Sequence, residues 1–495
     1  MRQAMSDDES YKELLIKKDA TEEDEDAHGS SSYTVEEAIE KMGFGWFQIR
    51  LLALCGVAWM ADSMEMSILA ILGPAVRCEW YLTHWHEAFL TTVVFIGMFI
   101  STYFWGYMAD AYGRKTVVIF ASLGIFYYGL VSSISPRYIW IVIFRGMVGF
   151  SMSGVVQGTT LISEYLPTKA RGLTISFSSC FWSIGTSIEI LTAMFVMPTL
   201  GWRWQLFFSS LPSLLFLSVA KMLPESARFY VASGQQEKAI EMLELVSKLN
   251  KEDLPDGKLI AAKTTCNRGS IIEMFKGGTW KTTVLLWIIW FGSHFNIYGL
   301  ALLTTSLYSS GYACYGNAPL PSEDITNCVY CKSLEKTDYL NFFLVLTADF
   351  LCVLIVAALA DTIGRKRLQG VGFLVMGMFY SMLYICTRSK SWTTFFLFGA
   401  RCFAAVADLG GYIYTPEVYP THIRGMALGS CSGISRIGCM LTPFVAQVLA
   451  HKSIHLTIGL YVGVSLAGFI CSLLLPIETK GRKLVVSWNV FMTAC

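Results

Sequence analysis

The chain has 495 residues, of which 54% are hydrophobic and only 15% are charged. Soluble globular proteins carry about 25% charged residues, so this composition excludes an ordinary soluble enzyme and indicates a membrane protein. The formal net charge is +1. The charges gather at the N-terminus, in a central segment and in short loops, so no basic surface for nucleic acid is predicted.

An acidic tail precedes the apolar part of the chain. Residues 22–26 are Glu-Glu-Asp-Glu-Asp, and residues 1–45 lack the charged start and short apolar run of a cleavable signal peptide. We interpret the acidic run as a solvated tail, and a tail that binds a partner protein is the alternative. Within 33–48, apolar residues recur at helical spacing after Thr34, which predicts a short helix with Thr34 as its N-cap.

The rest of the chain contains apolar runs that are long enough to cross a bilayer. A hydrocarbon core of about 30 Å requires about 20 apolar residues in a helix, and twelve runs meet this requirement. They are 47-75, 87-108, 116-134, 138-160, 172-197, 203-223, 281-307, 338-360, 368-387, 392-414, 425-450 and 454-475.

Basic residues mark one side of the membrane. Short connectors carry Arg114 and Lys115 in the first half of the chain and residues 365–367 in the second, and more basic residues are scattered through 224–280. The positive-inside rule therefore places both termini and the central segment in the cytosol. The predicted organisation is a tail with a short helix at 1-45, an N-terminal half at 46-223, a linker at 224-280, a C-terminal half at 281-475 and a tail at 476-495.

The two halves repeat two motifs in the same order. Residues 109–115 (ADAYGRK) recur as 360–366 (ADTIGRK), and residues 164–172 (EYLPTKARG) recur as 417–425 (EVYPTHIRG). The first motif follows the second apolar run of its half, and the second motif follows the fourth. Two related halves around a midline are typical of transporters. The sequence therefore predicts an all-α membrane fold with twelve transmembrane helices in two six-helix halves.

These loop motifs have the chemistry of a gate. Gly113 permits a tight reversal, and Asp110 is placed to stabilise the dipole of a helix N-terminus. An ion pair between Glu164 and Arg171 across the loop could lock the halves on one side and break when the protein opens; simple anchoring of the loops is the alternative. The gate candidates are Gly106, Asp110, Gly113, Arg114, Lys115, Glu164, Arg171, Asp361, Gly364, Arg365, Lys366, Glu417 and Arg424.

Charged side chains at membrane depth are costly and suggest function. Asp62 and Glu65 share one helical face, and Arg145 and Arg401 are a repeat-related pair, although structural pairing of acids with arginines is an equal alternative. With Asp408 and Arg436 included, acids outnumber arginines in the runs, which favours a cationic solute or proton coupling. The candidate substrate or proton-coupling residues are Asp62, Glu65, Glu189, Asp349, Arg145, Arg401 and His294, the last of which could equally be a packing residue.

Most of the 14 cysteines lie in apolar runs, where a buried free thiol is expected. Cys78, Cys314, Cys328 and Cys331 are predicted to face the outside or a lumen, and four such cysteines allow three pairings, so one or two disulfides are expected. The pair Cys328 and Cys331 has no matching second pair, so no metal site is predicted.

The first loop motif resembles that of the major facilitator superfamily, in which Gly106, Asp110, Gly113, Arg114 and Lys115 match the pattern Gly-x-x-x-Asp-x-x-Gly-Arg-Lys. The second copy has Ala357 in place of the first glycine. Within that superfamily the chain is similar to the branch of synaptic vesicle glycoprotein 2 and the synaptic vesicle 2-related protein over residues 33–482. The resemblance implies a multi-pass carrier fold and residence in a vesicle membrane, with the plasma membrane as the alternative. The stretches that carry it are 33–48, 77–80, 201–204, 224–229, 414–420 and 476–482.

These observations favour a secondary-active transporter of a small organic solute that works by alternating access. The alternative is a carrier fold that no longer transports and acts as a receptor or regulator in a vesicle membrane. No phosphate-binding loop, metal-binding helix motif or nucleophile elbow is present, so neither an enzyme nor a cofactor is predicted. The expected partners are the lipid bilayer, a small solute, protons and a protein that binds the tail.

Overall fold

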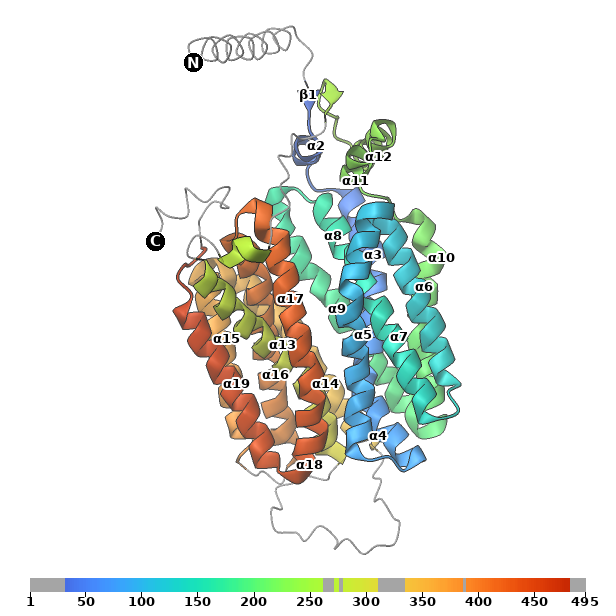
Figure 1. Ribbon diagram of the computed structural model, residues 1–495, viewed down its shortest axis with the longest axis vertical. Helices are drawn as coiled ribbons and strands as arrows, with labels where there is room; N and C mark the ends of the chain where they lie inside the picture. The colour runs from blue at the N-terminus through green and yellow to red at the C-terminus, as the bar shows by residue number, and fades with distance from the viewer. Residues whose placement is uncertain (1–31, 261–270, 276–278, 310–333, 386–388, 481–495) are drawn as a thin grey trace, which may run out of the picture.

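The computed structural model describes residues 32–260, 271–275, 279–309, 334–385 and 389–480, and these are almost entirely helical (Figure 1). The acidic run 22–26 and residues 481–495 lie outside the described residues. The predicted short helix is α2, Val35–Met42. Thr34 caps it through a capping box with Glu37, because the Thr34 side chain accepts a hydrogen bond from the Glu37 N–H and the Glu37 carboxylate accepts one from the Thr34 N–H.

The N-terminal half contains six membrane-crossing units, of which the first and the fourth are divided into two helices. The first unit is interrupted at Ile68, shortly before Pro74 of α4, and the fourth is interrupted at Val156. The helices are α3 Trp46–Ser67, α4 Leu69–Trp80, α5 His84–Tyr112, α6 Arg114–Ser133, α7 Tyr138–Val155, α8 Gln157–Glu164, α9 Thr168–Thr199 and α10 Trp202–Val219.

The C-terminal half also contains six units. The fifth includes a π-helical turn, Phe444–Leu449, directly after Pro443. The helices are α13 Trp280–Ser309, α14 Lys336–Ile363, α15 Arg365–Met382, α16 Lys390–Val418, α17 Thr421–Pro443 continued by α18 Ala450–Lys452, and α19 Ile454–Leu474.

Eleven of the twelve units in the described residues are long and apolar enough to cross a membrane. The exception is α15, which has 18 residues and begins with the basic residues 365–367. Because α15 still packs along α16 and α19, it belongs to the same bundle. The predicted all-α fold of two six-helix halves is confirmed.

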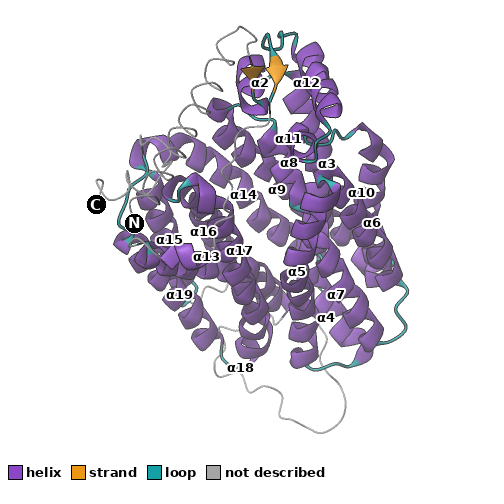
Figure 2. Cartoon of the chain, turned by 45° about the horizontal axis from the view of Figure 1, so that its top comes forward, coloured by secondary structure: helices purple, strands orange, loops and turns teal. Residues whose placement is uncertain are grey.

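A small polar assembly covers one face of the bundle, which we call the linker face; the opposite face is the far face (Figure 2). It consists of α2, α11 Ala227–Ala232, α12 Gln236–Asn250 and a two-stranded parallel sheet of β1 Ser32–Tyr33 and β2 Lys258–Leu259. Two short 3-10 helices, Ala220–Met222 and Ile271–Phe275, join it to the bundle. The α12 helix buries Ala239, Leu243 and Val246, as its amphipathic pattern predicts.

The halves contact each other along two pairs of helices. The α9 helix packs against α14, and α5 packs against α17 and the π-helical turn that follows it. In Figure 1 the N-terminal half lies to the right and the C-terminal half to the left, with α9, α5, α14 and α17 between them. Residues near these helices are therefore the ones that both halves can reach.

Close helix packing inside each half depends on particular glycines. A Cβ at Gly149 of α7 would lie 2.1 Å from the carbonyl oxygen of Val94 in α5. Because that obstacle is backbone, Gly149→Ala is expected to push the two helices apart and destabilise the protein by about 1–3 kcal/mol, seen as a lower melting temperature of the purified protein. Gly429→Ala is the control, since a Cβ there would meet nothing within 4 Å. Equal shifts for the two variants would contradict this account.

Candidate functional site

Glu65, Glu189 and Arg145 form a buried cluster inside the N-terminal half. Arg145 donates from Nη1 to Glu65 Oε2 at 2.6 Å and from Nη2 to Ser132 Oγ at 3.0 Å, and both charged residues are completely buried. Glu189 accepts a hydrogen bond from Gln205 Nε2 at 2.9 Å and interacts electrostatically with Glu65 and Arg145. Three of the candidate site residues therefore lie together, within one half.

Asp349 and Arg401 form a separate pair inside the C-terminal half. Arg401 holds the carboxylate with two hydrogen bonds of 2.8 Å, from Nε and Nη2, and donates a third of 2.9 Å to the Ile297 carbonyl oxygen. Arg401 is 5% exposed and Asp349 is 7% exposed. Arg145 and Arg401 are thus both neutralised by an acid of their own half, and the two parallel hydrogen bonds of Arg401 suit the planar guanidinium.

Asp62 and His294, the remaining candidates, lie at the boundary between the halves. Asp62 of α3 is 5% exposed, and its Oδ1 has no hydrogen-bond donor among the described residues. Arg436 of α17 attracts it electrostatically from the other half. His294 Nδ1 lies 3.1 Å from Asp408 Oδ1, which also accepts a hydrogen bond of 2.9 Å from Ser293. We call Asp62, His294, Asp408 and Arg436 the central cluster.

Aromatic rings surround the central cluster. His294 stacks on Trp290, with ring centroids 5.7 Å apart, and lies near Tyr298 and Tyr412 at 6.1 Å and 6.2 Å. Tyr298 also packs against Phe95 of the other half at 5.2 Å. Tyr412 is 44% exposed although its ring contacts buried Trp290, so one side of this aromatic wall is open.

An open helix face connects the linker face with the central cluster. On α17, Gly425, Gly429, Gly433 and Arg436 follow one another at spacings of four, four and three, so they share one face. A Cβ at any of the three glycines would meet nothing within 4 Å. Arg436 follows these glycines at the end of the open face, and its Nη1 lies 3.4 Å from Met98 Sδ of α5. On the linker-face side of this contact, α17 therefore has open space along one face.

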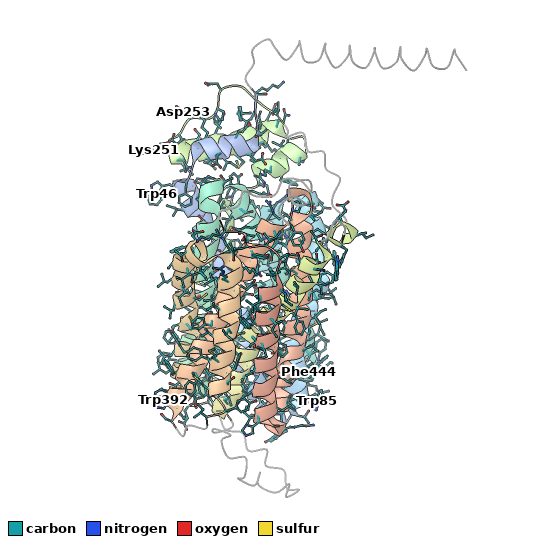
Figure 3. All side chains as sticks on the ribbon, turned by 90° about the vertical axis from the view of Figure 1, so that its left-hand side faces the viewer. Trp46, Trp85, Lys251, Asp253, Trp392 and Phe444 are labelled. Carbon is teal, nitrogen blue, oxygen red and sulfur yellow. The ribbon has the colours of Figure 1, made fainter. Side chains whose placement is uncertain are left out.

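The halves are closed against each other at the far face. Thr92 of α5 donates to the Met440 carbonyl oxygen at 3.1 Å, and the rings of Trp85 and Phe444 are 5.6 Å apart. Figure 3 shows these two side chains at the end of the molecule opposite Lys251 and Asp253. The rings of His84 and His451 stack there with centroids 3.7 Å apart. The halves are thus in contact at the far face, whereas α17 has open space along one face nearer the linker face.

The first loop motif forms a charged cluster at the linker face. Gly113 has φ +95°, a conformation that favours glycine. We expected Asp110 to stabilise the following helix N-terminus, but the carboxylate that accepts the N–H groups of Arg114 and Lys115, at 2.9 and 3.2 Å, is that of Glu225. Asp110 instead lies 3.8 Å from the Arg114 guanidinium.

The copy of this motif in the C-terminal half, residues 360–366, has the same arrangement. Gly364 has φ +97°, and the N–H of Lys366 donates to Glu478 at 3.4 Å. Arg365 lies 2.8 Å from Asp361 and 3.4 Å from Glu417, as Arg114 lies 3.3 Å from Glu164 in the first half.

The acid after the fourth span therefore pairs with the base after the second span. Glu164 was expected to pair with Arg171, but it contacts Arg114, and the Arg171 side chain lies outside the described residues. Arg424 is partly buried and engaged. Near the first cluster, the Tyr165 hydroxyl donates to the Glu225 carbonyl oxygen at 2.6 Å, and burial raises the pKa of Tyr165.

Cys78 is disulfide-bonded, and its partner lies outside the described residues, as do Cys314, Cys328 and Cys331. The pairing therefore stays open among the predicted alternatives. The cysteines of the described spans, such as Cys55 and Cys352, are free, and all of them except Cys180 are buried.

Sequence reasoning missed several residues of these sites. Glu225 and Glu478 were not among the candidates, although each follows the sixth span of its half in a short stretch that begins with proline, 224–228 and 476–482. Asp408 and Arg436 were recognised as charges at membrane depth, but no role was assigned to them. The signal that distinguishes Arg436 is the run of glycines before it on the same helix face.

Two six-helix halves that meet around charged residues at membrane depth, with matched ion pairs at one face, define a multi-pass membrane carrier. The chain matches the family model described as sugar (and other) transporter over residues 62–486. It is 44% identical to the synaptic vesicle 2-related protein of Bos taurus and 43% identical to that of Xenopus laevis, in each case over 92% of this chain and 82% of the relative.

Solved structures show the same fold. The partially occluded, inward-open xylose transporter XylE from E. coli matches 88% of this chain and 100% of its own, with a TM-score of 0.67 and 16% identity. XylE bound to 6-bromo-6-deoxy-D-glucose matches with a TM-score of 0.61 and 18% identity. The chain belongs to the sugar (and other) transporter family of the major facilitator superfamily, and resembles its synaptic vesicle 2-related branch.

Proposed function

We propose that this protein moves a small organic solute with a cationic group across a membrane by alternating access, and that the solute binds at the central cluster. The observation that carries the proposal is the position of Asp62. It is a buried carboxylate at the boundary between the halves, and the described residues provide no hydrogen-bond donor for its Oδ1. A buried acid without a partner is costly, so a bound cation or a proton is the natural counterpart.

Asp62 is also the residue that we propose for proton coupling. The other acids at membrane depth are engaged: Glu65 by Arg145, Asp349 by Arg401 and Glu189 by Gln205. Asp408 shares its carboxylate with His294 and Ser293. A carboxylate that both halves can reach could lose its proton when a solute binds and regain it when the solute leaves.

The loop clusters support a gate at the linker face. Each combines a base after the second span with an acid after the fourth, Arg114 with Glu164 and Arg365 with Glu417, and neither pair crosses between the halves within the described residues. We propose that these clusters meet when the linker face closes. The basic residues of both loops lie at this face, so the positive-inside rule makes it the cytosolic face, and the names of the relatives favour a vesicle membrane.

Asp62→Asn is expected to reduce solute flux at least about tenfold, because the amide keeps the shape of the carboxylate and loses its charge. The measurement is uptake of radiolabelled organic cations by proteoliposomes that contain the full chain, with and without a pH gradient. Asp253→Asn is the matched control, since Asp253 is an exposed aspartate outside the membrane region. Its flux is expected to equal that of the unmodified protein.

Two outcomes would count against the proposal. If Asp62→Asn and Asp253→Asn both retain full flux, the solute does not bind at the central cluster. If no cation of the panel enters faster than into protein-free liposomes, the chain is a carrier fold that acts as a receptor or regulator.

A further inference from the structure

Three arginines of the described spans lie at membrane depth, and one of them differs from the other two. Arg145 and Arg401 each touch a carboxylate of their own half, at 2.6 and 2.8 Å. Among the described residues, the Arg436 guanidinium has no ion pair, and its one hydrogen-bond acceptor is the weak Met98 sulfur. A guanidinium carries five N–H donors, so Arg436 retains unused donors toward the space between the halves.

Arg436 is partly exposed, and the open face of α17 lies between it and the linker face. The open positions above Gly425, Gly429 and Gly433 lead along α17 to this side chain. Tyr412, which is 44% exposed, and Tyr298 lie close enough to interact with Arg436 electrostatically. A small molecule that enters from the linker face therefore meets a cation flanked by aromatic rings.

Asp62 is an acid of the other half that interacts electrostatically with Arg436. Arg436 and Asp62 attract each other, yet they do not form an ion-pair contact in the described structure. Their opposite charges belong to different halves, and each group retains unused hydrogen-bonding capacity. A ligand with one charge of each sign satisfies both groups, whereas a simple cation leaves Arg436 unpaired and a simple anion leaves Asp62 unpaired.

We infer that the solute is a zwitterion, whose anionic group binds Arg436 and whose cationic group binds Asp62. This inference rests on the proposed function and names the substrate class of the same site. A zwitterion also bridges the two halves, because Asp62 belongs to α3 and Arg436 to α17. Its binding draws the halves together and so favours closure of the linker face.

The test compares compounds that share a carbon skeleton and differ in charge. One set is L-phenylalanine, phenethylamine and 3-phenylpropanoate; the other is glycine betaine, tetramethylammonium and acetate. Thermal stabilisation of the purified full chain and uptake by proteoliposomes are measured for each compound. In at least one set the zwitterion is expected to bind about tenfold or more tightly than either singly charged analogue, as a lost charge-assisted hydrogen bond requires.

The two charges are then removed one at a time. With Arg436→Gln the zwitterion is expected to bind no better than the cation of its set, and with Asp62→Asn no better than the anion. Without ligand, Arg436→Gln is expected to leave the melting temperature unchanged or higher, because no carboxylate loses its partner, whereas Arg401→Gln lowers it.

Each result decides between the alternatives. If the zwitterion has no advantage in either set, including the case in which no compound binds, the inference is overturned. It is also overturned if Arg436→Gln lowers the melting temperature as much as Arg401→Gln does. If the cations alone are carried and depend on Asp62, transport at the central cluster stands and the zwitterion does not. If zwitterions bind with this charge dependence but are never carried, the substrate class stands and transport does not.

Discussion

Arg401→Met alone is expected to destabilise the protein more than Arg401→Met and Asp349→Met together. Asp349 accepts two hydrogen bonds of 2.8 Å from Arg401 and is 7% exposed. Loss of the arginine leaves a buried carboxylate without compensation, which costs about 3–5 kcal/mol. Replacement of both residues by apolar side chains removes this penalty, so the double variant recovers most of the stability.

The measurement is the apparent melting temperature of the purified protein in detergent. Arg401→Lys is expected to fall between the unmodified protein and Arg401→Met, because an ammonium keeps the charge and cannot form the two parallel hydrogen bonds. Arg228→Met is the control. Arg228 lies 3.1 Å from Glu36 in an exposed pair, and such pairs contribute only about 0–1 kcal/mol. A double variant as unstable as the single one would show that packing, rather than charge, governs this position.

Acidification of the far face from pH 7.5 to 5.5 is expected to separate the two halves there. His84 of α5 and His451 of α18 stack across the boundary with ring centroids 3.7 Å apart. Histidine changes charge between about pH 5 and 8. Burial of His451 opposes a positive charge on its ring while the rings are stacked, so the closed state takes up fewer protons than the separated state.

The neighbouring charges decide the sign of this effect. Arg77 of α4 faces the two rings, and Glu87 of α5 lies 3.5 Å from His84 but is already paired with Arg77 at 2.9 Å. His84 and Arg77 add to this opposition. Protonation therefore weakens the closed state only, so closure is complete at high pH and is lost as the pH falls, by about fivefold or more in population.

Distances between spin labels at Ile134→Cys and Leu456→Cys, two exposed positions in different halves, report this separation. The distance is expected to lengthen at low pH in the unmodified background and to stay short in His84→Gln with His451→Gln. His86→Gln is the matched control, because His86 packs against Tyr138 within its own half. An equal lengthening in all three backgrounds would exclude the histidine pair as the cause.

The fold was predictable because its signals are local and repeated. Each run of about 20 apolar residues specifies a helix that only lipid or other helices can cover. The recurrence of 109–115 at 360–366 specifies two halves. The short helix after Thr34 was equally accessible, since both members of its capping box lie within four residues. The α15 helix was found in spite of its basic start because residues 368–387 form an apolar run.

The candidate site was predictable only as a set of charges. Sequence position indicates that Glu65, Asp62, Arg145 and Arg436 lie at membrane depth, but it does not indicate which of them meet. Glu65 and Asp62 are three residues apart on one helix. Even so, Glu65 pairs inside its own half while Asp62 faces the other half.

The sequence by itself therefore determined the class of protein, the number of spans, the two-fold repeat and the residues that carry charge into the membrane. Tertiary structure alone decided which charges are neutralised and which face open space. The physical reason is that a charge at membrane depth must find a partner, and the choice of partner depends on how helices distant in sequence pack. That packing pairs Arg145 and Arg401 within their halves and leaves Arg436 opposite Asp62 at the boundary.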